Sequence, residues 1–155
     1  MIENPNFALD LGHPWRQVSN DDPDQYSFRD DARDIDITLS AIALDIAADA
    51  LDQFASVLVD SRLRAEGDAT RALDHCATIY EPIIVPRPWG RAVAYYGHDD
   101  SGRQFGYSGL VTRRSVISLY MSAAGLSERE LMEAMDEVGS RIDFDRSPLR
   151  IGDHP

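Results

Sequence analysis

Lysine is absent from the 155 residues, and all 15 basic side chains are arginines. A single cysteine, Cys76, excludes an internal disulfide, and we expect it to be buried as a small apolar side chain. No run of about 18 apolar residues is present, so a membrane-spanning helix is not expected. The first residues have neither a positive charge nor an apolar stretch behind them, which is unlike a secretory signal. These absences predict a cytoplasmic protein that does not bind a membrane.

Negative charge is abundant and unevenly distributed. The chain has 27 acidic residues and a formal net charge of −12, and residues 1–80 contain 16 of the acids but only six arginines. Such a field repels phosphate backbones, so neither nucleic acid nor an anionic membrane surface is an expected partner. A basic protein partner would be attracted by the same field. Solubility alone is the other interpretation of the charge.

Alternating apolar residues predict four strands in the first third of the chain. Ile35, Ile37 and Leu39 are separated by polar residues, so one face of this strand is apolar and the other is polar. Shorter segments with this pattern are 7–11, 15–18 and 26–28. From about residue 45 to 65, apolar residues recur every three or four positions. This spacing predicts an amphipathic helix, capped by Asp45 or Asp49 and ending near Gly67.

The second half predicts a run of strands and one further helix. Strand-like segments lie at 73–85, 91–96, 104–111 and 116–121, with no helix between them. Ser127 and Glu130 have the spacing of a capping box, which predicts a helix that ends near Ile142. The order predicts an α+β fold, in which an antiparallel meander sheet is flanked by two main helices as an α/β/α sandwich. Residues 1–155 are expected to form one domain, with a core at 5–146 and a C-terminal tail at 147–155.

Two segments give the chain a resemblance to a known family. The opening Phe7-x-Leu9-x-Leu11-x-x-Pro14-Trp15 and the later Trp89-Gly90-Arg91-Ala92-Val93-Ala94-Tyr95-Tyr96 resemble domains of the PsbP/DcrB-like superfamily. The resemblance continues through Gly102 to a C-terminal helix closed by Phe144, and covers roughly residues 5–146.

That resemblance implies an antiparallel sheet flanked by helices and no enzymatic activity. Members of the superfamily act as binding or scaffold modules. They include subunits of photosynthetic complexes, envelope lipoproteins and small bacterial chaperones of secreted effector proteins. This chain has no lipoprotein signal or lipoprotein cysteine, which argues against the envelope branch. The resemblance supplies no catalytic residue.

Patterns typical of catalysis or cofactor binding are missing. Ser108 lies between glycines, but a nucleophile elbow requires a strand-to-helix turn, and here a strand is predicted. The four histidines are far apart in sequence, and no glycine-rich phosphate loop occurs. We therefore predict no catalytic residue, no metal and no cofactor.

Two features are candidate partner-binding sites. The first is a group of aspartates expected on turns at one end of the first half of the sheet: Asp21, Asp22, Asp24, Asp30, Asp31 and Asp34. The second is Trp89, which follows Pro88 in a stiff loop, although Trp89 at the edge of the core is an alternative.

The sequence predicts a non-catalytic protein-binding module, such as an adaptor, a chaperone or an immunity-type protein. Its partner would be a basic or apolar segment of a secreted effector or toxin. One alternative is a small-molecule-binding or enzymatic domain with a pocket between sheet and helices. Another is a homodimer that pairs through a sheet edge or the meander face.

Overall fold

The computed structural model describes residues 2–4 and 7–143. Two α-helices lie in this part of the chain, α1 (Leu51–Ala72) and α2 (Glu128–Ser140), and a short 3-10 turn (Ala48–Ala50) precedes α1. The strands are β1 (Ile2–Asn4), β2 (Phe7–Leu9), β3 (Arg16–Val18), β4 (Gln25–Asp30), β5 (Ile35–Ala43), β6 (Ala77–Ile79), β7 (Ile83–Arg87), β8 (Gly90–Asp99), β9 (Gln104–Thr112), β10 (Ser115–Ala123) and β11 (Ile142–Asp143).

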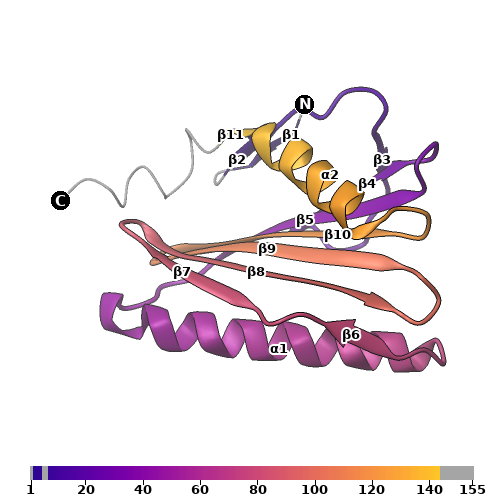
Figure 1. The fold of residues 1–155 in the computed structure, drawn as a ribbon. Coiled ribbons are helices and arrows are strands. Elements are labelled where there is room, and N and C mark those ends of the chain that lie inside the picture. Colours follow the sequence, from indigo (N-terminus) through magenta and orange to yellow (C-terminus); the bar gives the residue numbers. More distant parts are fainter. Residues whose placement is uncertain (1, 5–6, 144–155) are drawn as a thin grey trace.

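A large antiparallel sheet forms the middle layer of the molecule. Its strand order is β3-β4-β5-β10-β9-β8-β6, and β7 pairs with the same strand, β8, as β6 does. Helices α1 and α2 lie on opposite faces of this sheet, and a small sheet of β1, β2 and β11 lies beside α2 (Figure 1). The predicted α+β class, an antiparallel sheet with a helix on each face, is confirmed.

The face beneath α2 is a continuous apolar core. Ile37 and Leu39 of β5 point into it, as their alternation with polar residues predicts, and they pack in the same cluster as Leu131 and Val138 of α2. Each such side chain contributes about 1.5–3 kcal/mol on full burial. Trp15 is buried in this cluster too.

The start of α2 is fixed by its predicted cap. The Ser127 hydroxyl accepts a hydrogen bond from the Glu130 N–H at 3.2 Å, and the Glu130 carboxylate accepts one from the Ser127 N–H at 3.1 Å. The capping box is thus confirmed. The hydrogen bond from the Ser127 N–H is the main cause that lowers the pKa of Glu130.

The face beneath α1 is built from aromatic rings. Val59 of α1 packs with Tyr95 of β8 and with Phe105 and Tyr107 of β9. The rings of Tyr95 and Tyr107 are stacked, with their centroids 5.4 Å apart. The 22 residues of α1 span about 33 Å at 1.5 Å per residue, and most of their contacts with the sheet are with β6, β8 and β9. The helix therefore covers one half of this face of the sheet.

Three predictions in this region are wrong. The helix expected at 45–65 continues to Ala72, and Gly67 lies inside it. Asp74, at φ 59°, supplies the left-handed turn expected at Gly67. The continuous strand expected at 73–85 is instead a turn after this helix, followed by β6 and by the start of β7, with Pro82 between these two strands. Cys76 is exposed, because it lies in the loop before β6.

Proline protects the outer edge of β7. Arg87 and Gly90 pair across a two-residue turn and form the end of the β7–β8 hairpin. In a hairpin with a two-residue turn, the pair next to the turn is hydrogen-bonded, and bonded and non-bonded pairs alternate from there. The next pair, Pro86 with Arg91, is therefore non-bonded, and the backbone of Pro86 points away from β8. Pro86 has no N–H, and Pro82 and Pro88 precede and follow the strand. An edge with so few donors is a poor template for pairing with another chain.

Candidate functional site

The structure separates the predicted aspartate cluster into two groups. Asp21, Asp22 and Asp24 are exposed on the turn between β3 and β4. The Asp22 N–H donates to Asn20 Oδ1 at 3.0 Å, and the Asp24 N–H donates to Asp22 Oδ1 at 2.9 Å, so the turn is held by its own side chains. The Ala41 N–H donates to the Asp24 carbonyl at 3.3 Å. This turn therefore lies beside the end of β5.

Asp30 and Asp31 lie at the opposite end of β4, about 20 Å away for a six-residue strand. Asp30 is 1% exposed and accepts a hydrogen bond from Arg33 at 2.5 Å. Burial raises the pKa of Asp30, but the hydrogen bonds from Arg33 outweigh it and the net shift is downward. Asp31 is paired with Arg16 at 2.6 Å, and this contact is the main cause that lowers its pKa.

The other predicted site residue is distant from both groups. Trp89 is half-buried in the turn between β7 and β8, which lies at the opposite edge of the sheet from β3 and β4. Asp34 pairs with Arg29, as Asp31 does. The structure therefore does not bring the predicted residues together. Of the predicted aspartates, only Asp21, Asp22 and Asp24 show no arginine partner among the described residues.

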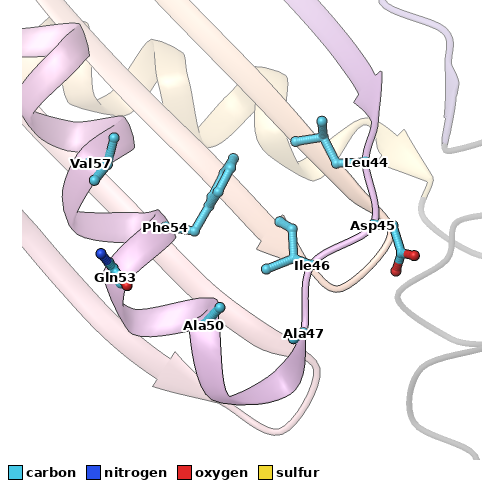
Figure 2. A pocket seen from close by; sticks show the side chains of 8 residues that line it. All are labelled: Leu44, Asp45, Ile46, Ala47, Ala50, Gln53, Phe54 and Val57. Atoms are coloured by element: carbon cyan, nitrogen blue, oxygen red, sulfur yellow. The ribbon is translucent and has the colours of Figure 1, made fainter.

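A groove whose residues the sequence did not single out as a site lies between α1 and the uncovered half of the sheet. Its outer part is an apolar pocket of about 370 Å³, in which Phe54 reaches from α1 toward Ile46 and Leu44 while Asp45 points away (Figure 2). The residues around this pocket are Leu44, Asp45, Ile46, Ala47, Ala50, Gln53, Phe54 and Val57. Several are unusually exposed for apolar side chains, since Leu44 is 37% and Val57 59% exposed.

The inner part of the groove is more polar. A second pocket of about 280 Å³ has a floor from β5 and β10 with the hydroxyl groups of Thr38, Ser40 and Ser118, and Arg62 lines it from α1. The two pockets share Leu44 and Phe54, so they form one depression, which we call the α1 groove.

The acidic turn adjoins the α1 groove. Gln25 lines the inner pocket and also a hollow of about 420 Å³ at the β3–β4 turn, in which Asp22 takes part. The polar side of β5, predicted from alternation alone, is thus the floor of the groove. The sequence signal that could have located it is the exposed apolar run at Ile42 and Leu44, where the alternation ends.

A buried network of charges lies behind the inner pocket. Glu66 is 4% exposed and accepts hydrogen bonds from the Tyr120 hydroxyl at 2.8 Å and from Arg103 Nη2 at 3.3 Å. The Nε of the same arginine lies 3.1 Å from Asp99 Oδ2. Burial, followed by the charge of Glu66, raises the pKa of Tyr120. The network holds α1 against β10 and against the turn between β8 and β9.

Other kinds of chemistry find little support in the geometry. Over residues 2–4 and 7–143, no three His, Cys, Asp or Glu side chains lie where they could share a metal ion. Ser108 lies within β9, paired with Leu119, and is not at a strand-to-helix turn. Neither of the helices described here is both long and apolar enough to cross a membrane.

Comparison with known proteins gives one clear result. No protein-family model and no curated protein sequence matches the chain. The solution structure of cyanobacterial PsbP (CyanoP) from Synechocystis sp. PCC 6803 superposes with a TM-score of 0.66, covering 90% of this chain and 87% of that one. The chain has a PsbP-like fold. The resemblance seen in the sequence is thereby confirmed for the fold, whereas 18% identity transfers no residue roles.

Proposed function

We propose that the protein is a non-catalytic, protein-binding module of the bacterial cytoplasm, of the adaptor, chaperone or immunity type. Its α1 groove would hold an apolar segment, flanked by basic residues, of a secreted effector or toxin. The observation that supports this most directly is the exposed apolar surface of the groove, formed by Ile42, Leu44 and Val57. Contiguous apolar patches on a protein surface commonly mark interaction sites.

The charge around the groove favours basic flanking residues in that segment. Asp21, Asp22 and Asp24 adjoin the inner end, and Asp45 lies at the outer end with its carboxylate pointing outward (Figure 2). Basic side chains that extend from the apolar segment could reach these carboxylates, and the net charge of −12 would speed the encounter. Asp31 and Trp89 lie outside the groove and are proposed as peripheral contacts, whereas Asp30 is buried and is not part of the proposed surface.

A matched pair of variants tests the location. Val57 in the groove and Ile83 on β7 are exposed to a similar degree, 59% and 56%. We expect Val57→Asp to abolish recovery of a stoichiometric protein partner from the native host, because it places a charge in the apolar contact. Ile83→Asp should leave recovery unchanged.

Wild-type protein that recovers no partner would contradict the proposed function. Equal loss in the two variants would contradict the location in the groove. Recovery that resists added salt would contradict the role given to the acidic turn, because contacts between exposed charges are screened.

A further inference from the structure

Within residues 2–4 and 7–143, Arg62 has no carboxylate partner, although the protein is rich in carboxylates. Seven arginines of this part of the chain form ion pairs with aspartate or glutamate: Arg16, Arg29, Arg33, Arg71, Arg91, Arg103 and Arg129. Arg62 is half-buried in the wall of the inner pocket, and its Nε is buried without a hydrogen-bond partner among the described residues. Because this Nε has almost no accessible surface, a ligand in the pocket would meet the terminal nitrogens of the guanidinium, whose charge no carboxylate of the described residues neutralises.

The guanidinium is held in place by aromatic rings. Its central carbon lies 4.9 Å from the ring centroid of Tyr107 and 5.4 Å from that of Tyr120. These contacts orient the planar fork, so less side-chain freedom is lost when a ligand binds. The buried hydroxyl of Tyr95 lies beside the same guanidinium: burial raises the pKa of Tyr95 to about 12, and the charge and side-chain contact of Arg62 oppose this rise.

The nearby acid Glu66 is already occupied. Its Oε1 accepts from Tyr120 and from Arg103, and no ion pair joins it to Arg62 in the described residues. The charge of Arg62 is therefore open on the pocket side. The hydroxyls of Thr38 and Ser40 line the same pocket and form no hydrogen bond within the described residues, so they can donate to the same ligand.

We infer that the inner pocket binds a carboxylate that carries an apolar body. The carboxylate would accept hydrogen bonds from Arg62 and from the hydroxyls of Thr38 and Ser40. Its apolar body would extend past Leu58 and Phe54 into the outer pocket. The two pockets, of about 280 and 370 Å³, together reach the size of small-molecule sites. The inference does not depend on a protein partner, because a small molecule can supply this chemistry.

Titration with octanoate, followed by NMR of the backbone amides, tests the site. We expect saturable shifts at residues 38–44, 54–62 and 116–120, and none with 1-octanol, which has a similar chain but no charge. Arg62→Met should weaken octanoate binding at least tenfold, since a charge-assisted, bidentate contact is lost. Arg62→Lys should weaken it less. If octanol binds as well as octanoate, or if no groove amide shifts with octanoate, the inference is wrong.

Thr38→Val provides a control that preserves the fold. The residue is a half-buried position on β5, and valine keeps the shape of the side chain and the strand propensity while removing the hydroxyl. We expect a several-fold loss of octanoate affinity with the melting temperature preserved. An affinity equal to that of the wild type would remove the hydroxyls from the proposed site.

The source of the carboxylate can be distinguished with peptides. Acetyl-leucyl-leucine as the free acid presents a chain-terminal carboxylate, and its amide is the neutral control. Tighter binding of the free acid than of octanoate would indicate the C-terminus of a partner protein, and the reverse order a free carboxylic acid. If neither acid binds better than its neutral analogue, the inference fails, whatever the result of partner capture.

Discussion

Replacing Arg103 by methionine is expected to destabilise the protein strongly. Its guanidinium pairs two buried acids, with 3.3 Å to Glu66 Oε1 and 3.1 Å to Asp99 Oδ2. Asp99 keeps hydrogen bonds from the N–H and hydroxyl of Ser101, whereas Glu66 keeps only that from Tyr120. Removing one partner of a buried ion pair costs about 3–5 kcal/mol, because the remaining charge is desolvated and unpaired.

Thermal and urea unfolding of the Arg103→Met variant measure this loss. A chain of 155 residues has an unfolding entropy of about 0.33 kcal/mol/K, at about 2.1 cal/mol/K per residue. A loss of about 3–5 kcal/mol therefore corresponds to a fall of about 9–15 °C in Tm. Arg129→Met is the matched control, because Arg129 pairs with Glu133 on the exposed side of α2, where such pairs contribute little.

The pH dependence identifies the cause. Burial raises the pKa of Asp99, but hydrogen bonds from Ser101 and Arg103 outweigh it and the net shift is downward. Without Arg103 this pKa rises, so the folded variant binds more protons than the folded wild type, and its deficit relative to the wild type shrinks as the pH falls from about 5 to 3. Adding Glu66→Gln to the variant should restore part of the stability at pH 7. A deficit below about 1 kcal/mol, or one that is independent of pH, would refute the reasoning.

Three further outcomes test the fold. Gly90→Ala should prevent folding or cost more than about 4 kcal/mol, since an added Cβ would lie 1.9 Å from the Val111 carbonyl oxygen at a φ of +153°. Gly125→Ala is the control and should leave the Tm unchanged, because no atom lies within 4 Å of its added Cβ. Similar melting curves for the two variants would contradict this prediction. Because the pKa of Asp30 is lowered, the folded state binds fewer protons than the unfolded state, and wild-type stability should fall as the pH drops from about 5 to 3. The unfolding free energy of Asp30→Asn, measured with urea, should depend less steeply on pH. Equal slopes of unfolding free energy against pH in the two proteins would argue against this role of Asp30. Pro86→Val restores an N–H on the outer edge of β7 and should cause concentration-dependent association, which light scattering would detect. If the variant keeps the wild-type mass at every concentration, proline does not protect this edge.

The sequence predicted those elements whose determinants are local. The helix that became α2 has both its cap, Ser127 with Glu130, and its apolar spacing within 13 residues, and the structure has both. The start of α1 has no such signal, because Ala50 occupies the N-cap position without a side-chain hydrogen bond. Asp45 and Asp49 therefore suggested a start that the structure does not have.

The candidate site depended on information that is not local. Whether Asp24 and Asp30 share an end of the sheet is decided by the six residues of β4, which place the two turns at opposite ends. The pairing of Asp31 with Arg16 joins residues 15 positions apart, across two strands. Acidic composition alone could not show which aspartates lack an arginine partner.

The α1 groove follows from a mismatch between two patterns that were each visible in the sequence. Strand β5 is apolar on one face only, so the side chains of Thr38 and Ser40 point away from the α2 core. Helix α1 lies on that same side of the sheet, but its apolar residues, such as Val59, pack on the aromatic rings of β8 and β9. Because α1 packs on those rings, it does not also cover β4 and β5. The α2 face is therefore covered by apolar packing apart from a hollow of about 150 Å³ beside Leu39 and Ile142, while the α1 face keeps an open half with polar groups on its floor and an apolar rim. Ligand recognition by this PsbP-like fold is accordingly expected on the α1 side, where binding requires no opening of the core.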